Sequence, residues 1–70
     1  MKLYSLKSAN ILKVGYDEMN RILYIEFRLK AVHHYFDVPL DEFVAFMKAN
    51  DPEEYYMIYV QSKYHFDVFN

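Results

Sequence analysis

Hydrophobic and polar residues alternate along several short stretches of the chain, and a period of two is typical of a strand with one buried face. Residues 11–17 and 21–27 are rich in β-branched and aromatic side chains, and the letters DEMN between them suit a turn. This pattern predicts a hairpin. One side of its second strand is apolar and is expected to face the core. The residues on that side are Leu23, Ile25, Phe27 and Leu29.

Residues 31–38, with the letters AVHHYFDV, alternate in the same way and predict a third strand. Successive side chains of a strand point to opposite faces, so His33 and His34 are expected to point apart, with His33 on the side of Tyr35. Pro39 ends this strand because proline has no backbone N–H to donate. The letters KYHFDVF at residues 63–69 alternate again and predict a final strand in the same sheet.

The period changes to that of a helix after Pro39, which suits the first turn of a helix. Over residues 39–50, apolar residues follow at i, i+3, i+4 and i+7, and they are Leu40, Phe43, Val44 and Met47. Asp51 and Pro52 then predict the start of a second helix, with Asp51 as its N-cap. Residues 55–60, YYMIYV, suit either a helix or a strand, and the pattern leaves both open.

Together these elements predict an α+β domain with a small curved antiparallel sheet, in the order strand, strand, strand, helix, a second short helix, strand. A strong twist would close such a sheet toward a small open barrel, which the pattern does not decide. At 70 residues the chain is too short for two cores, so residues 1–70 are expected to form a single domain.

Composition narrows the classes of function. The chain has no cysteine, which removes disulfide and thiolate chemistry and fits a cytoplasmic protein. No stretch approaches the roughly 20 apolar residues of a membrane span, so no membrane partner is expected. The net charge of −2 argues against strong binding to a polyanion but leaves room for a small basic patch.

Three histidines, His33, His34 and His65, are the candidate metal ligands. Zinc needs three or four converging ligands, and two of these histidines are expected on opposite faces, so no metal or other cofactor is predicted.

Two pairs of neighbouring carboxylates, residues 41–42 and 53–54, fall at predicted helix starts, where capping and the helix dipole explain them. The single glycine excludes a glycine-rich phosphate loop. Since no nucleophile, base and orienting group occur together, the chain is predicted not to be an enzyme.

The segments SANILKVGYD, LYIEF, HHYFDVP and the closing KYHF, with an acidic helix between the last two, resemble the KTSC domain. That family occurs at the C-terminus of some lysyl-tRNA synthetases and as small proteins of bacteria and phages. The resemblance runs from about Ser8 to Phe66 and implies a fold, with RNA binding as the activity suggested for the family. The family's Tyr-x-Tyr pair corresponds here to His33 and Tyr35, and its Tyr-Phe-Asn step to residues 55–57.

Aromatic side chains interleaved with cations give the first functional hypothesis, binding of RNA or single-stranded nucleic acid. Rings stack on unpaired bases, and a few cations hold the backbone. Tyr24 is one such ring, with Lys13, Arg28 and Lys30 near the sheet edges. The residues proposed for the nucleic-acid surface are Tyr16, His33, Tyr35, Lys63 and Tyr64.

The alternative hypothesis is a protein interaction module. An exposed aromatic sheet face or an unpaired final strand would pair with another protein or with a second copy, giving a homodimer. Phe46 and Tyr59 lie off the apolar stripes of their predicted helices and are the proposed contact residues.

Overall fold

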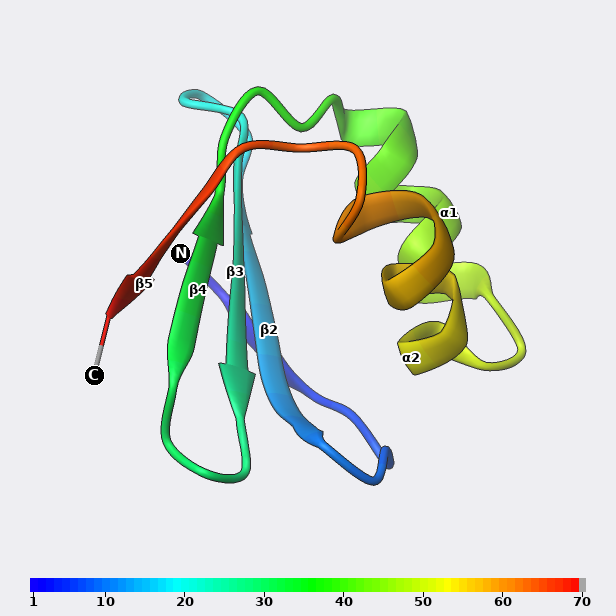
Figure 1. Cartoon of the computed structure of the whole chain (residues 1–70). Coiled ribbons are helices and arrows are strands. Elements are labelled where there is room, and N and C mark those ends of the chain that lie inside the picture. The colour runs from blue at the N-terminus through cyan, green and yellow to red at the C-terminus, as the bar shows by residue number, and fades with distance from the viewer. Residues whose placement is uncertain (70) are drawn as a thin grey trace.

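A computed structural model describes residues 1–69 as one sheet with all helical segments on one of its faces (Figure 1). The strands are β1 (Leu3–Ser5), β2 (Ile11–Asp17), β3 (Ile22–Phe27), β4 (Val32–Tyr35) and β5 (Phe66–Phe69). The helical segments are α1 (Leu40–Lys48), α2 (Pro52–Tyr55) and η1 (Tyr56–Val60), the last a single π-helical turn. The predicted α+β class is therefore confirmed.

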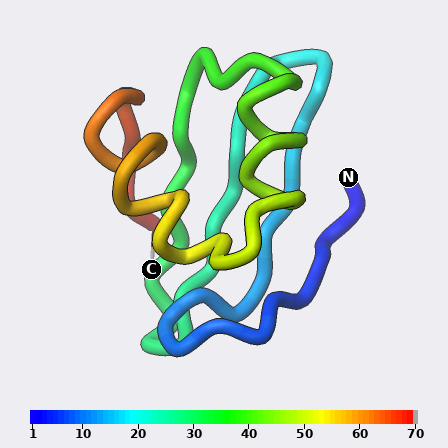
Figure 2. Tube along the Cα trace, turned by 90° about the vertical axis from the view of Figure 1, so that its right-hand side faces the viewer, coloured from blue at the N-terminus to red at the C-terminus, as the bar shows by residue number. Residues whose placement is uncertain are grey.

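The sheet is antiparallel throughout, and its order β1-β2-β3-β4-β5 follows the chain. Within residues 1–69, β1 and β5 form its two edges and do not pair with each other, so the sheet is open and not a barrel. Figure 2 shows α1 in front of β2 and β3, and α2 with η1 in front of β4, toward the β5 edge. The opposite face of the sheet carries no helix among the described residues 1–69.

Strand β1 was not expected from the sequence, because it is only three residues long and all three are exposed. It is held by its pairing with β2, where Leu3 lies opposite Gly15. A Cβ atom on that glycine would come within 2.8 Å of Leu3 Cδ2, so the chain's single glycine allows the leucine to lie over β2.

The predicted hairpin of β2 and β3 is confirmed, and Leu23 and Ile25 are fully buried in the core. Leu29 is an exception, since 95% of its side chain is exposed. It lies in the turn between β3 and β4, where Lys30 adopts a positive φ of 74° and the strand period no longer applies.

Strand β4 corresponds to the predicted third strand of residues 31–38. It ends three residues earlier than predicted, at Tyr35. Asp37 has a φ of 57°, which turns the chain and lets the Val38 amide donate to the Arg21 carbonyl at 2.9 Å. Val38 is thereby buried in the core. The final strand is likewise shorter than residues 63–69 and begins at Phe66.

Helix α1 is present as predicted, but only half of its predicted apolar stripe faces inward, since Phe43 and Met47 pack against the core. Leu40 and Val44 are exposed, whereas the buried residues of the helix are Glu42 and Phe46. Phe46, predicted as a contact residue, has no exposed surface and belongs to the core. The carboxylate of Glu42 faces inward because it is held by Tyr55 of α2 and by Lys63 and Tyr64, which follow η1.

The second helical segment resolves the open choice for residues 55–60, which are helical. Asp51 accepts a hydrogen bond from the Glu54 amide at 3.1 Å, so its predicted N-cap role is confirmed. At the end of α2 the helix widens into η1, where the Gln61 amide donates to the Tyr56 carbonyl at 2.8 Å. This turn buries Tyr56 and leaves Tyr59 exposed.

The core lies between the sheet and the helices and is built mainly of strand residues. Its buried members are Ile11, Val14, Leu23, Ile25, Tyr35, Val38, Phe46, Tyr56 and Val60. No helix within residues 1–69 is long and apolar enough to cross a membrane.

Candidate functional site

A groove of about 390 Å³ opens between η1 and the turn that joins β3 to β4. Three of its lining residues carry rings and come from three different elements, Phe27 from β3, His33 from β4 and Tyr56 from η1. The polar lining residues are Asn10, Arg28, Glu53 and Gln61. A flat molecule in this groove would meet both ring surfaces and hydrogen-bonding groups.

The rings are placed by the sheet and by the turn. The Phe27 amide donates to the Ala31 carbonyl at 2.9 Å, which brings the ends of β3 and β4 together. The rings of Phe27 and His33 then lie 4.7 Å apart at 63°, and the Phe27 and Tyr56 rings 5.8 Å apart at 60°. Edge-to-face packing of this kind fixes ring orientations. Phe27 and His33 are half-buried, so part of each ring faces the groove.

Behind these rings runs a chain of hydrogen bonds. His33 Nδ1 lies 3.3 Å from the Tyr35 hydroxyl, which lies 2.5 Å from the Tyr56 hydroxyl. Burial raises the pKa of both tyrosines, which remain neutral, and burial lowers the pKa of His33, which favours the neutral imidazole near pH 7. Within residues 1–69, His33 Nε2 makes no hydrogen bond and is the ring nitrogen left for a ligand.

The polar side of the groove is held together by Glu53. Its Oε1 accepts from the Asn10 amide at 2.9 Å and its Oε2 from Asn10 Nδ2 at 2.6 Å. These bonds from Asn10 keep the pKa of Glu53 below its usual value. The expectation that helix capping explains this carboxylate is wrong, because Glu53 ties α2 to the start of β2.

Cations gather near the same end of the molecule. Arg28 Nε donates to the Ser8 carbonyl at 3.1 Å, which ties the β3–β4 turn to the loop that precedes β2. Lys30 lies in the same turn as Arg28, and Lys7 is next to Ser8 in the chain. Three cationic side chains therefore border the groove or its neighbourhood.

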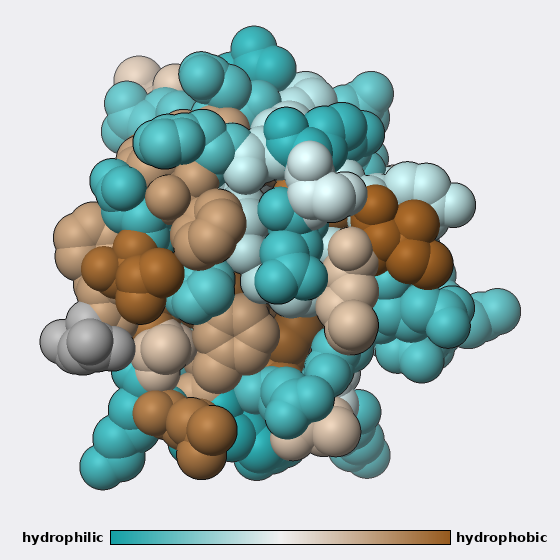
Figure 3. Space-filling view, viewed as in Figure 1, coloured by the Kyte–Doolittle hydropathy of each residue, from teal (hydrophilic) through white to brown (hydrophobic). Residues whose placement is uncertain are grey.

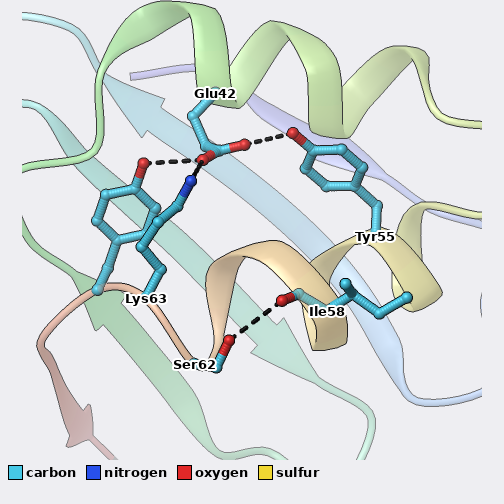
Figure 4. A network of polar contacts seen from close by, with 6 residues as sticks. Glu42, Tyr55, Ile58, Ser62 and Lys63 are labelled. Carbon is cyan, nitrogen blue, oxygen red and sulfur yellow. Dashed lines mark hydrogen bonds and ion pairs between the residues drawn. The ribbon is translucent and has the colours of Figure 1, made fainter.

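A second polar cluster lies between α1 and the end of η1, around the buried carboxylate of Glu42 (Figure 4). Glu42 Oε1 accepts from the Tyr64 hydroxyl at 2.8 Å and pairs with Lys63 Nζ at 2.7 Å. The Tyr55 hydroxyl donates to the other oxygen, Oε2. Capping therefore does not explain this carboxylate either, since it joins three segments of the chain.

The pKa shifts in this cluster indicate that the partners of Glu42 stabilise its negative charge. Burial alone would raise the pKa of Glu42, but the hydrogen bonds from Lys63, Tyr55 and Tyr64 outweigh it and lower the pKa. The bond to Glu42 raises the pKa of Tyr55 to about 12, and burial together with Glu42 raises that of Tyr64 to about 12. All four groups are thus engaged with one another.

The structure does not bring the five residues of the predicted nucleic-acid surface together. Tyr35 has no exposed surface, so its ring cannot stack on a base, and its assignment to an exposed surface was wrong. Lys63 and Tyr64 bind Glu42, and Tyr16 stacks on Phe43 at 4.7 Å. The Tyr16 hydroxyl donates to the Val38 carbonyl at 2.5 Å. His33 is the member of the five that lines the groove.

Asn10, Tyr56 and Gln61 were not predicted from the sequence as site residues, and Phe27 was predicted only as a core residue. Asn10 was one of the residues that carried the family resemblance, which is the signal that would have found it. Tyr56 falls in the step of residues 55–57 that corresponds to the family's Tyr-Phe-Asn, but a tyrosine beside other apolar residues suits the core equally well.

His33 and His34 point to opposite faces, as predicted, since His33 pairs with Ile25 and His34 with Tyr24. On the face without helices, the His34 ring lies 4.3 Å from the Tyr24 ring and 4.1 Å from the Phe69 ring. Within residues 1–69, no three histidine or acidic side chains converge in a way that could hold a metal ion.

The chain was compared with family models, solved structures and curated proteins. A family model described as the KTSC domain matches residues 7–64. The crystal structure of a KTSC domain protein from Yersinia pestis is similar, with a TM-score of 0.92 and 28% sequence identity, over 99% of this chain and 97% of that chain. No curated protein matches the chain.

Proposed function

The chain belongs to the KTSC domain family, and from that premise we propose that it is a non-enzymatic binding domain whose ligand is RNA or another single-stranded nucleic acid. The ligand is held at the groove between η1 and the β3–β4 turn. The observation that carries this proposal is the meeting of ring surfaces, amide groups and an arginine in one groove.

The ring surfaces suit an unpaired base. Stacking on an aromatic side chain stabilises a bound base by roughly 1 to 3 kcal/mol and accepts any base. Phe27 and His33 are partly exposed, with one face of the His33 ring stacked on Phe66 at 5.1 Å, and Tyr56 adds a buried ring to the lining. His33 Nε2 and the Gln61 amide are the groups that a base edge would contact by hydrogen bonds.

The cations suit the phosphates that accompany a base. Arg28 lines the groove itself, and Lys7 and Lys30 are close to it in the chain. Glu53 lies in the same groove, but its charge is engaged by the amide groups of Asn10. Three phosphate contacts would give a single strand a salt dependence of about −2 in log affinity per log salt.

We propose no catalysis because neither hydrogen-bonded carboxylate, the buried Glu42 or the partly exposed Glu53, suits a general base. Glu42 and Glu53 both accept several hydrogen bonds, which stabilise the charged form and lower the pKa of each. A cytoplasmic location and a bacterial or phage source are part of the same proposal and fit a chain without cysteine.

The test is binding of a short labelled single-stranded RNA, measured by fluorescence anisotropy at two salt concentrations. Arg28→Gln is expected to weaken binding several-fold and to reduce the salt dependence. Arg21→Gln is the matched control, since Arg21 lies in the β2–β3 turn and does not line the groove. Equal weakening by both variants, or no binding by the unmodified chain, would overturn the proposal.

A protein segment is the second candidate for this groove. Leu29 and Met57 line it and are strongly exposed, so they would receive an apolar side chain. Binding of a protein would depend on Leu29→Ser far more than on salt, whereas binding of a nucleic acid has the opposite dependence.

A further inference from the structure

The two edges of the sheet differ in how far they resist pairing with another chain. Strand β1 has three residues, and Lys2 and Lys7 lie close to it in sequence, features that protect an edge. Strand β5 has four residues with the letters FDVF and contains neither lysine nor proline. Its register with β4 continues without a bulge over all four residues. The β5 edge is therefore the unprotected one.

The side chains of β5 are also poorly covered. Val68 pairs with His33 and so lies on the helix side of the sheet, yet 52% of it is exposed. Phe69 lies on the other face, where its ring packs on His34, and 46% of it is exposed. Figure 3 shows apolar residues gathering over the part of the surface where β5 lies, at the left of the view. Apolar surface thus reaches the edge on both faces.

The backbone of β5 is oriented for a further strand. The Phe36 amide donates to the His65 carbonyl at 2.9 Å, so that carbonyl points toward β4. Backbone groups of successive strand residues point to alternate sides. The N–H and C=O of Val68, three residues further on, therefore point away from β4, toward the open edge.

From this geometry we infer that a second copy of the chain pairs antiparallel along β5, about a two-fold axis at Val68. In that register the two Val68 residues exchange both backbone hydrogen bonds, and Asp67 of one copy lies opposite Phe69 of the other. A register centred on Asp67 would instead place two like charges opposite each other, which is unfavourable. The paired sheets would cover Val68 and form one continuous sheet.

The partner strand proposed for the β5 edge is β5 of a second copy, because this strand can pair with itself. Its apolar residues and outward backbone groups meet the same groups across the two-fold axis, and its one charge, Asp67, meets a ring. Asp67 also disfavours a nucleic acid at this edge. This pairing does not depend on the groove, since Val68 does not line it.

The test is the molar mass by light scattering and sedimentation over a wide range of protein concentration. The unmodified chain is expected to form a dimer as concentration rises, and Val68→Lys to remain a monomer several-fold beyond that range. The matched control is Val44→Lys, an exposed valine of α1, which is expected to dimerise like the unmodified chain. Circular dichroism establishes that each variant is folded.

Amide hydrogen exchange gives a second readout that does not need a variant. The Val68 amide is expected to exchange more slowly as concentration rises, and the exposed amides of the β3–β4 turn are not. A chain that stays monomeric throughout, or equal loss of dimer in Val68→Lys and Val44→Lys, would overturn the inference. Arg28→Gln leaves the dimer intact in either case, so failure here is distinct from failure of the proposed nucleic-acid site.

Discussion

The Glu42 cluster and the groove each combine a glutamate with a tyrosine of the second helical segment, Tyr55 in the first and Tyr56 in the second, but they differ in how their polar groups are bonded. At Glu42 the carboxylate, two hydroxyls and Lys63 Nζ bind one another. At the groove, Glu53 is engaged, while His33 and Gln61 line an open space of about 390 Å³. The Glu42 cluster also lines a hollow, of about 340 Å³, but its polar groups are bound to one another, and in this sense it is closed. In the groove, His33 Nε2 makes no hydrogen bond within residues 1–69, and in this sense the groove is open.

This difference separates a structural role from a binding role. A buried polar group without a partner costs free energy, so a cluster that satisfies all its members contributes to folding. Polar groups that make no hydrogen bond within the protein keep water as their partner and exchange it for a ligand. Substitutions at Glu42 should therefore change stability, whereas substitutions around the groove mouth should change affinity.

The largest expected effect is that of Glu42→Gln, which lowers the free energy of unfolding by about 2 kcal/mol because Lys63 loses its charged partner and two hydroxyls lose a strong acceptor. Urea denaturation measures it. Glu54→Gln is the matched control, since Glu54 is exposed, and is expected to change stability by less than about 0.5 kcal/mol. Equal losses of stability in the two variants would contradict a structural role for the Glu42 cluster.

The next effect is that of Tyr35→Phe, which leaves the Tyr56 hydroxyl and His33 Nδ1 without their common partner. We expect a loss of about 1 to 2 kcal/mol in the free energy of unfolding. Tyr4→Phe, at an exposed tyrosine of β1, is the control and should be nearly neutral. A neutral Tyr35→Phe would mean that water replaces the missing hydroxyl, and that the chain of hydrogen bonds contributes little.

Acid should reduce the contribution of the Glu42 cluster to the free energy of unfolding. The pKa of Glu42 is lowered in the folded state, so its contribution is present above the ordinary value of 4.5 and is lost as the pH falls through the lower folded value. Denaturation curves between pH 7 and pH 3 should therefore show a smaller difference between Glu42→Gln and the unmodified chain at acid pH. A difference that stays constant would contradict the assigned charge.

The smallest expected effect on stability is that of Arg28→Gln, within about 0.5 kcal/mol, because the side chain is exposed and makes one hydrogen bond to a carbonyl. Thermal unfolding beside Arg21→Gln checks this. A loss as large as that of Glu42→Gln would show that Arg28 acts in folding, and the groove would no longer stand apart from the closed cluster.

Much of the fold could be predicted because its strands alternate cleanly and its helix starts carry clear signals. The hairpin, the opposite directions of His33 and His34 and the Asp51 cap all follow from local periodicity and capping. The side of α1 that faces the core could not be predicted from hydrophobicity alone. Its inward face includes a carboxylate whose partners, residues 55, 63 and 64, come from later segments of the chain.

The candidate site was harder to predict than the fold because the burial of each side chain decides whether it can reach a ligand. Tyr35 and His33 share a strand face, yet the first is covered by the helices and the second reaches the groove. Tyr56 follows Tyr55 directly, and only the turn of the helix sends one to the groove and the other to Glu42. No pattern along the chain distinguishes these neighbours.

The most direct test of the comparison is a titration of ¹⁵N-labelled protein with short single-stranded RNA, followed by NMR. We expect salt-sensitive shifts at Arg28, His33 and Gln61, with the amides of Glu42 and Lys63 unmoved. Shifts at the Glu42 cluster with a silent groove, or no shifts anywhere, would contradict it.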